Sequence, residues 1–221
     1  TLWTNTARTT QVTADGDLVR AMDDKSGNGK HVTEATNPPI YRTSGGLHWL
    51  EFDGTNDKLD VTSIVATTDV VHMFVAGQKD SPANFEGFMV IDTTGTSGGQ
   101  RHIGASVGTA FIADARSANN NASVTVADST VTTVVDAVFQ NNAFGASVNS
   151  IKIGANGGSF SVRASASPAL SNIGTPTLSI GRGLTNVYFS GKFYGALIRD
   201  EELSSGDRAA LVAWMRAKAG I

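Results

Sequence analysis

The sequence predicts an all-β protein, a two-sheet antiparallel β-sandwich that ends in one short α-helix. Apolar segments of strand length recur from residue 47 to residue 199, with turn residues between them. The chain contains 24 Gly and only 5 Pro, a composition that suits short strands joined by tight turns. A succession of strands without intervening helices is typical of two sheets that bury each other's apolar faces.

The predicted strands follow one another closely along the chain. They span residues 47–52, 58–62, 70–78, 87–92, 101–104, 110–115, 131–140, 144–153, 177–181 and 187–199. Segments 70–76 and 131–139 are apolar on both sides, as expected for strands deep in a sandwich. The Ser-, Gly- or Asn-rich segments 93–99 and 119–123 are predicted to be loops.

Residues 1–46 are predicted to be a mostly irregular lead-in segment that packs on the sandwich. A short helix is expected around residues 17–22, followed by a turn-rich run at residues 24–29. Pro38 and Pro39 then force extended backbone before the first strand. With no internal repeat and no linker in view, the whole chain, residues 1–221, is expected to form a single domain.

The last strand is predicted to have one core face and one amphipathic face. Alternation places Phe189, Phe193 and Leu197 on the core face with Gly191 and Gly195, and Tyr188, Lys192 and Tyr194 on the other face.

A helix is predicted from Ser204 to about Ala219. Ser204 is suited to be the N-cap, with Asp207 three residues later, and Gly220 is placed to end the helix. Leu211, Met215 and Ala219 repeat at helical spacing, and Trp214 is expected to pack beneath neighbouring structure.

Composition and charge exclude several classes of function. The net charge is −3 and no basic run is present, so nucleic acid is not an expected partner. The chain has no cysteine, which removes disulfides and thiol chemistry, and no apolar stretch of the ~20 residues that membrane insertion requires. Because the sequence begins with Thr1 and not Met, we expect a trimmed or processed fragment.

Four segments resemble a known family, the laminin-G-like jelly-roll domains of the concanavalin A-like lectin/glucanase superfamily. They are residues 12–17, the turn at residues 24–29, the Phe-Asp-Gly corner within residues 50–57, and the closing strand-to-helix unit at residues 191–204. The resemblance implies a jelly roll and often carbohydrate recognition. The N-terminal half is most similar to domains on tail fibres or head spikes of tailed phages and gene transfer agents.

This narrower resemblance implies a particular context for the domain. It implies a virion-surface or extracellular location, with bacterial surface polysaccharide and other virion subunits as partners. It also implies a homo-oligomer in the full-length protein.

Enzymatic relatives of this fold carry three acidic residues at alternate positions of one strand. Here Glu51 and Asp53 have that spacing, but Thr55 stands where the third carboxylate would be. The favoured interpretation is that Glu51 faces solvent and Asp53 braces the turn at Gly54, so no catalytic residue is predicted.

A metal site is a weaker alternative. Some relatives hold calcium at the sandwich rim with Asp, Asn and carbonyl oxygens, and Asp53, Asn56 and Asp57 cluster in one turn. Bracing of the turn without metal is the favoured alternative, and no other cofactor is expected. His31, His48, His72 and His102 show no paired spacing typical of zinc or of a catalytic triad.

Aromatic side chains that stack on sugar rings and planar polar groups that bind hydroxyls are the expected sugar-binding residues. The candidates on exposed strand faces are Trp49, Tyr188 and Tyr194, and the loop candidates are Arg101, His102, Arg116, Asn119 and the two Asn residues that follow it. For each aromatic residue, packing beneath a loop or helix is the alternative.

Three functions follow from these observations. The first is a non-catalytic carbohydrate-binding domain for host-surface recognition on a phage-like fibre or spike. The second is a structural virion module that packs against copies of itself or the capsid, since a surface rich in small residues suits close packing. The third is a glycan-degrading hydrolase that uses Glu51 and Asp53.

Overall fold

The computed structural model describes ten ranges of the chain. These are residues 1–64, 69–80, 86–92, 99–105, 108–117, 120–128, 130–140, 151–163, 176–183 and 187–221, with the backbone only for 116–117, 120–122 and 127–128. Asn119 and most of the predicted loop 93–99 lie outside these ranges, as do residues 144–150 of one predicted strand.

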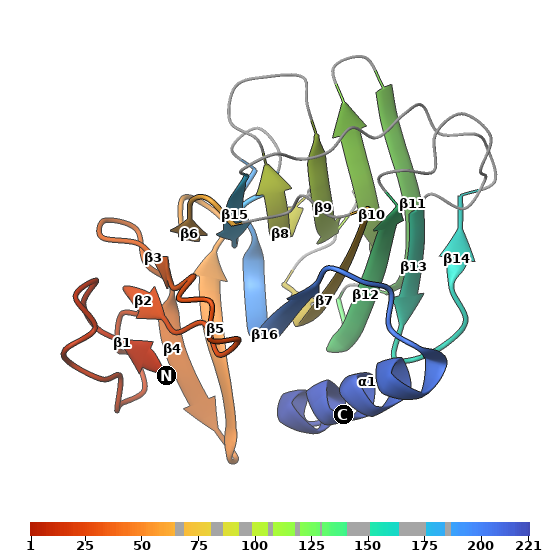
Figure 1. Cartoon of the computed structure of the whole chain (residues 1–221). Helices are drawn as coiled ribbons and strands as arrows, with labels where there is room; N and C mark the ends of the chain where they lie inside the picture. The colour runs from red at the N-terminus through yellow and green to blue at the C-terminus, as the bar shows by residue number, and fades with distance from the viewer. Residues whose placement is uncertain are drawn as a thin grey trace.

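Within these ranges the strands form two antiparallel sheets that pack face to face, as the sequence predicts (Figure 1). The nine-stranded sheet has the order β1 (Leu2–Trp3), β2 (Ala21–Met22), β3 (Val32–Thr33), β6 (Leu59–Val61), β15 (Thr177–Ile180), β8 (Glu86–Asp92), β9 (Gln100–Ala105), β10 (Ala110–Ser117), β11 (Asn120–Asp128). The seven-stranded sheet has the order β14 (Ser161–Val162), β13 (Ile151–Ala155), β12 (Thr133–Gln140), β7 (Val70–Lys79), β16 (Ser190–Arg199), β5 (Leu47–Asp53), β4 (Ile40–Ser44).

The core lies between the sheets and is rich in phenylalanine. Phe52 on β5 contacts Phe189 and Phe193, with ring centroids 5.7 and 6.2 Å apart, and Phe88 stacks on Phe189 at 4.0 Å. Tilted and edge contacts of this kind are favourable for aromatic rings, and they add to the burial of apolar surface. This cluster joins strands that are distant in the sequence.

The strands that the sequence pattern missed are the short strands of residues 1–46 and strands at sheet edges. β4 and β14 are the edges of the seven-stranded sheet, and β11 is an edge of the nine-stranded sheet. The prediction of a loop over residues 119–123 is therefore wrong for residues 120–123, which pair with β10. An edge strand needs fewer apolar residues, because solvent borders it on one side. The polar sequence of such a strand lacks the apolar pattern by which strands were recognised.

The helix predicted around residues 17–22 is also wrong. Asp17 instead accepts hydrogen bonds from the backbone N–H groups of Thr13 and Ala14, which closes a turn, and the chain then extends into β2. Val19 and Ala21 are buried in the sandwich core. The lead-in segment thus adds three short strands to the nine-stranded sheet.

A β-bulge in β16 overturns one predicted face. The pairing with β7 shifts between Phe193 and Gly195, which makes Tyr194 the extra residue of the bulge. A one-residue shift exchanges the faces of a strand. Leu197 therefore packs on the outer face of the sheet, where the predicted alternation placed it in the core.

The C-terminal helix α1 (Ser205–Ala219) is confirmed together with its caps. The Ser204 side chain accepts from the Asp207 N–H, and Gly220 ends the helix with φ 76°. Figure 1 shows α1 lying across the seven-stranded sheet. Its apolar stripe, which includes Val212 and Met215, covers Phe74 and Val134. Trp214 was expected to be packed, but 58% of it is exposed.

Candidate functional site

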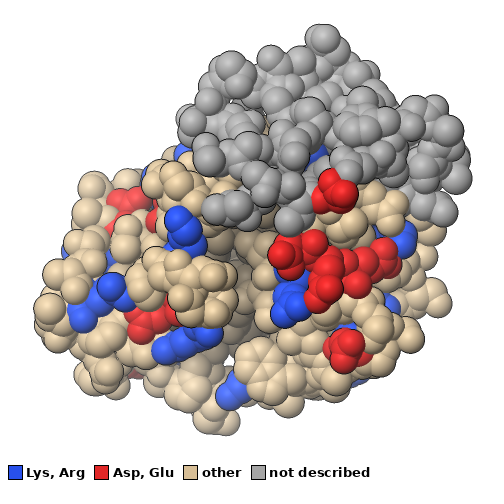
Figure 2. Space-filling model, in the orientation of Figure 1, with Lys and Arg blue, Asp and Glu red and all other residues tan. Residues whose placement is uncertain are grey.

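Helix α1 covers only part of the outer face of the seven-stranded sheet. Beside it lies an uncovered area that we call the open face, formed by Arg42, Trp49, Glu51, Gln78, Thr132, Lys192 and Tyr194. Figure 2 shows the surface hollowed between the part of the molecule that carries β4 and β5 and the part that carries α1, with Lys and Arg on both sides.

Strand register places these side chains together. On β5, Trp49 and Glu51 point away from the core because Leu50 and Phe52 point into it. Lys192 pairs with Glu51 on one side and with Gln78 on the other, so the three side chains share a face. Tyr194 lies two residues after Lys192 on β16 and faces the same side, as the alternation predicts.

Trp49, Lys192 and Tyr194 form the centre of the open face. The rings of Trp49 and Tyr194 are tilted at 46° with centroids 6.2 Å apart, and the Lys192 Nζ lies 5.4 Å from the Trp49 centroid. All three residues are half-buried. A cation over an indole ring contributes about 0.5–1 kcal/mol at a partly exposed site, so Lys192 is held there only loosely.

The indole N–H of Trp49 is shielded from solvent and has no hydrogen-bond partner among the described residues. An unsatisfied buried donor costs about 1–3 kcal/mol. A buried donor without a partner requires a specific explanation. One explanation is that a bound ligand supplies the acceptor that the Trp49 N–H lacks.

Polar pairs border this centre on two sides. Arg42 forms an ion pair with Glu51, and its Nη1 lies 3.4 Å from an Asp15 carboxylate oxygen. On the other border the Thr132 hydroxyl donates to Gln78 Oε1 at 3.1 Å, and the Gln78 amide donates to the Thr130 carbonyl at 2.9 Å. The border side chains are thus fixed by each other.

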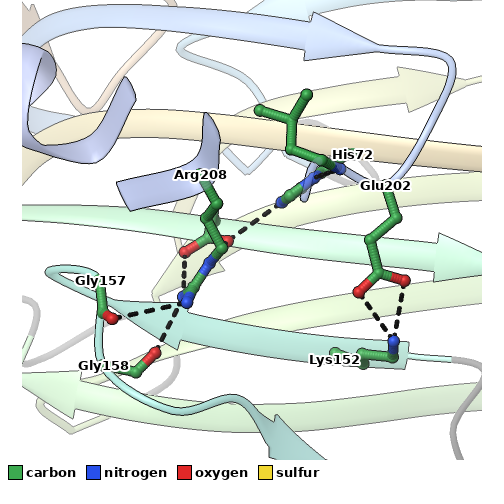
Figure 3. A network of polar contacts seen from close by, with 8 residues as sticks. His72, Lys152, Gly157, Gly158, Glu202 and Arg208 are labelled. Atoms are coloured by element: carbon green, nitrogen blue, oxygen red, sulfur yellow. Dashed lines mark hydrogen bonds and ion pairs between the residues drawn. The ribbon is translucent and has the colours of Figure 1, made fainter. Parts of the chain in front are cut away.

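A second polar cluster lies at the N-terminal end of α1 and fixes the helix (Figure 3). Arg208 donates from Nε and Nη2 to the two carboxylate oxygens of Asp136, at 2.7 and 2.9 Å. The His72 Nε2 lies 3.0 Å from the same carboxylate, and its Nδ1 accepts from the Leu203 N–H. Burial raises the pKa of Asp136, but the hydrogen bonds from His72 and Arg208 outweigh it, so the pKa is lowered overall.

This cluster is structural rather than a ligand site. Asp136 and His72 are fully buried. Arg208 also donates hydrogen bonds to the Gly157 and Gly158 carbonyl oxygens. Every group in the cluster is therefore occupied by the contacts that hold α1 to the sheet.

Of the predicted sugar-binding residues, the structure brings Trp49 and Tyr194 together. Arg101 and His102 were expected on a loop, but they lie within β9 and are fully buried. Burial lowers the pKa of Arg101 to about 10. Tyr188 lies outside the seven-stranded sheet, in an isolated bridge with Arg182. Arg116 was also expected on a loop, but its backbone lies in β10.

The acidic turn braces itself. Asp53 accepts from the backbone N–H groups of Thr55 and Asn56, at 2.7 and 3.3 Å, and Asp57 accepts from the Asp53 N–H at 3.0 Å. Burial and the nearby negative charge of Asp53 raise the pKa of Asp57 to about 6. The parts of the chain that the structure describes contain no group of three or more His, Cys, Asp or Glu placed to hold a metal.

Four residues of the open face were not candidates from the sequence: Arg42, Gln78, Thr132 and Lys192. Lys192 carried a usable signal, because its alternation with Tyr194 on the amphipathic face of the last strand was visible. Arg42 and Gln78 carried none, since only strand pairing brings β4 and β7 beside Trp49 and Lys192.

The fold resembles several solved structures. These include a heptameric SAP-like pentraxin from Limulus polyphemus, with a TM-score of 0.55, 13% identity, and coverage of 73% of this chain and 80% of that one. The CBM40 domain of a Ruminococcus gnavus IT-sialidase, bound to α2,3-sialyllactose, gives a TM-score of 0.54 at 14% identity and covers 74% and 95%. Domain 4 of AbnA, a GH43 extracellular arabinanase from Geobacillus stearothermophilus, was solved with arabinotriose and gives 0.55 at 9%, covering 81% and 82%.

These similarities show a lectin-like β-sandwich fold, and at such low identity they show the fold alone. No protein-family model and no curated protein sequence matches the chain. Among the described residues, no helix is long and apolar enough to cross a membrane.

Proposed function

We propose that this protein is a non-catalytic carbohydrate-binding domain whose open face contacts the glycan. The observation that carries the proposal is the pair Trp49 and Tyr194, held half-buried on one sheet face beside Lys192. Aromatic rings bordered by fixed polar groups are the usual means of sugar recognition. The similar folds that were solved with sialyllactose and arabinotriose support the same proposal.

A binding role fits the acidic residues better than hydrolysis does. Glu51 is engaged in its ion pair with Arg42, and Asp53 accepts two backbone hydrogen bonds in its turn. Glycoside hydrolysis needs two carboxyl groups that face each other across the sugar. Both carboxylates here have structural partners instead.

The finer part of the proposal concerns the context of the domain. We propose that it acts outside the cell or on the surface of a phage-like virion, as a fibre or spike domain that recognises bacterial surface polysaccharide. Its support is the resemblance of the N-terminal half of the chain, which includes residues 12–17, 24–29 and 50–57, to such domains. Binding to capsulated bacteria, compared with their capsule-free mutants, tests this part separately.

The central test is a glycan-array and calorimetric comparison of the wild type with Trp49→Ala and Tyr194→Ala. Removal of a central aromatic residue from a binding site typically costs about 2 kcal/mol or more, so affinity should fall at least tenfold in Trp49→Ala. Thermal unfolding of each variant separates a lost contact from a lost fold.

Trp214→Ala is the matched control. Trp214 is 58% exposed on α1, and Lys218 lies 5.9 Å from its ring, an arrangement like that of Trp49 and Lys192 but outside the open face. This variant should bind as the wild type does. The proposal fails if no glycan binds, or if Trp49→Ala and Trp214→Ala bind equally well in the folded state.

A further inference from the structure

We propose that the open face selects acidic saccharides, with Lys192 as the residue that binds a carboxylate or another anionic group of the sugar. This inference rests on the proposed function and adds the class of ligand. It is carried by the unpaired charge of Lys192, by the position of Lys192 over Trp49, and by the free hydrogen-bond donors there.

Lys192 is the cation of the open face that has no acidic partner. Its neighbour across the strand pair, Glu51, is bound by Arg42. Within the part of the chain that the structure describes, the Lys192 ammonium forms neither an ion pair nor a hydrogen bond, and its contact is the ring of Trp49. An anionic ligand could therefore bind the Lys192 ammonium without first breaking an ion pair between Lys192 and a carboxylate.

The acidic residues near this centre are neutralised or distant. Arg42 balances Glu51. Asp15 accepts from the Thr43 N–H on β4, the edge strand, which is separated from β16 by β5. Neighbouring strands are about 4.8 Å apart, so Asp15 lies roughly 10 Å from the strand of Lys192. Because Arg42 is shared between Glu51 and Asp15, the formal charges of Arg42, Lys192, Glu51 and Asp15 sum to zero, and the local positive charge at the centre is that of Lys192 alone.

The free hydrogen-bonding group at the centre is a donor. The Lys192 ammonium has three N–H groups with only a ring beside it. The Trp49 indole N–H also lacks a partner among the described residues, although it is shielded from solvent. Gln78 Oε1 already accepts from Thr132, and one Glu51 oxygen accepts from Arg42. A carboxylate is acceptor-only when ionised, and it complements such a set of donors.

The position of Lys192 also discriminates between ligands. A neutral sugar that stacks on Trp49 must displace the ammonium from the ring and offers it only neutral hydroxyl acceptors in exchange. An acidic sugar can hold the ammonium as its counter-ion while it contacts the aromatic pair. Lys192 is thus a specificity residue of the open face.

The test measures binding to three acidic polysaccharides, polygalacturonate, alginate and polysialic acid, and to their carboxyl-reduced neutral forms. The wild type should bind at least one acidic polymer about tenfold more tightly than its reduced form, since a charge-assisted hydrogen bond supports that ratio. Raising the salt from about 0.05 to about 0.5 M should weaken this preference.

Three variants assign the preference to Lys192. Lys192→Gln should bind the acidic and reduced forms within about twofold of each other, whereas Lys192→Arg, which keeps the charge, should retain the preference. Lys218→Gln, which removes the cation over Trp214, is the matched control and should behave as the wild type does.

The outcomes separate this inference from the proposed function. Binding of neutral glycans that depends on Trp49 but not on Lys192 would overturn the acidic preference and leave the proposed function standing. A preference that survives in Lys192→Gln would also overturn it. Absence of binding to every polymer and glycan would overturn both.

Discussion

At the scale of single residues, two buried polar groups bear on the binding and the stability of the protein. One is the Trp49 indole N–H, which is buried without a partner among the described residues. The other is Asp57, a carboxylate that is 8% exposed and lies close to Asp53. The first lies on the open face, where a ligand can supply the missing acceptor, whereas the second holds a turn together.

Asp57 makes the stability of the protein depend on pH. Burial and the charge of Asp53 raise the pKa of Asp57 to about 6 from 3.8, so the folded state holds the proton more tightly than the unfolded state does. The unfolding free energy should therefore fall as pH rises from about 4 to about 6, and stay lower above that range. Asp57→Asn keeps an oxygen for the Asp53 N–H but removes the charge.

The expected result for Asp57→Asn is a gain of about 2 kcal/mol at pH 7.5, which shrinks to zero below pH ~4. Urea unfolding across this pH range measures it. Asp200→Asn, which removes an exposed charge, is the control and should change the unfolding free energy by less than about 0.5 kcal/mol. A loss of stability in Asp57→Asn at pH 7.5 would contradict the role assigned to burial.

The same variant tests the calcium site that the sequence left as a weaker alternative at Asp53, Asn56 and Asp57. Bound Ca²⁺ would raise the Tm of the wild type on addition of CaCl₂, a chelator would reverse the rise, and Asp57→Asn would lose the response. If the Tm does not change when CaCl₂ is added, these side chains only brace the turn.

At the scale of elements, helix α1 is attached to the sheet at both ends. Arg208 and Asp136 fix its first turns, and Gly220 after its last turn packs against Leu47 of β5. The attachment decides where the outer face is covered, and so where the open face begins. An α1 that moved toward β5 would cover Trp49.

Arg208→Ala should destabilise the protein by about 3 kcal/mol, because it leaves the Asp136 carboxylate buried with His72 as its only described side-chain partner. Urea unfolding measures the loss, and hydrogen exchange in α1 should rise. The pKa of Asp136 is lowered in the folded state, so its contribution is present above pH ~4 and lost as pH falls further. Acid unfolding of the variant should therefore begin at a higher pH.

Arg199→Ala is the matched control for this prediction. Arg199 pairs with Glu201 on the surface, and both side chains are exposed. Removal of such a pair should cost less than about 0.5 kcal/mol. Equal losses in the two arginine variants would show that the buried contact to Asp136 is not what anchors the helix.

At the scale of the whole molecule, the nine-stranded sheet joins distant parts of the chain. Its edge strands β1 and β11 belong to opposite halves of the sequence, and Val19 and Val32 of the first 46 residues lie in the common core. We propose that these residues fold with the rest as one domain.

Val19→Asp tests that proposal. A charge at this fully buried position should cost several kcal/mol, and calorimetry should show a single transition at lower temperature if the lead-in segment unfolds with the sandwich. Leu18→Asp is the control. The side chain of Leu18, the residue before Val19, is 39% exposed, so a charge there should be tolerated. A separate early transition in Val19→Asp would show that the lead-in segment unfolds on its own.

Much of the fold could be read from local patterns. The central strands β5, β7, β8 and β12 are apolar enough for their length and type to be recognised, and α1 carries its caps in the sequence. Edge strands such as β11 and β14 were missed because their polar residues satisfy no core pattern, and β2 and β3 were missed because two residues are too few to show a period. The turn at Asp17 was mistaken for a helix start because Asp serves both purposes.

The sequence by itself determined the two-sheet sandwich, the C-terminal helix and the presence of Trp49 and Tyr194 as sugar-contact candidates, because these depend on residue type and periodicity. Only the tertiary structure decided which candidates meet. Strand order places β4, β5, β16 and β7 side by side, which brings Tyr194 next to Trp49, and the bulge before Gly195 turns Leu197 away from the core. Arg101 and His102 become buried for the same reason, since exposure depends on which strands pair and what covers them, and local periodicity does not encode either.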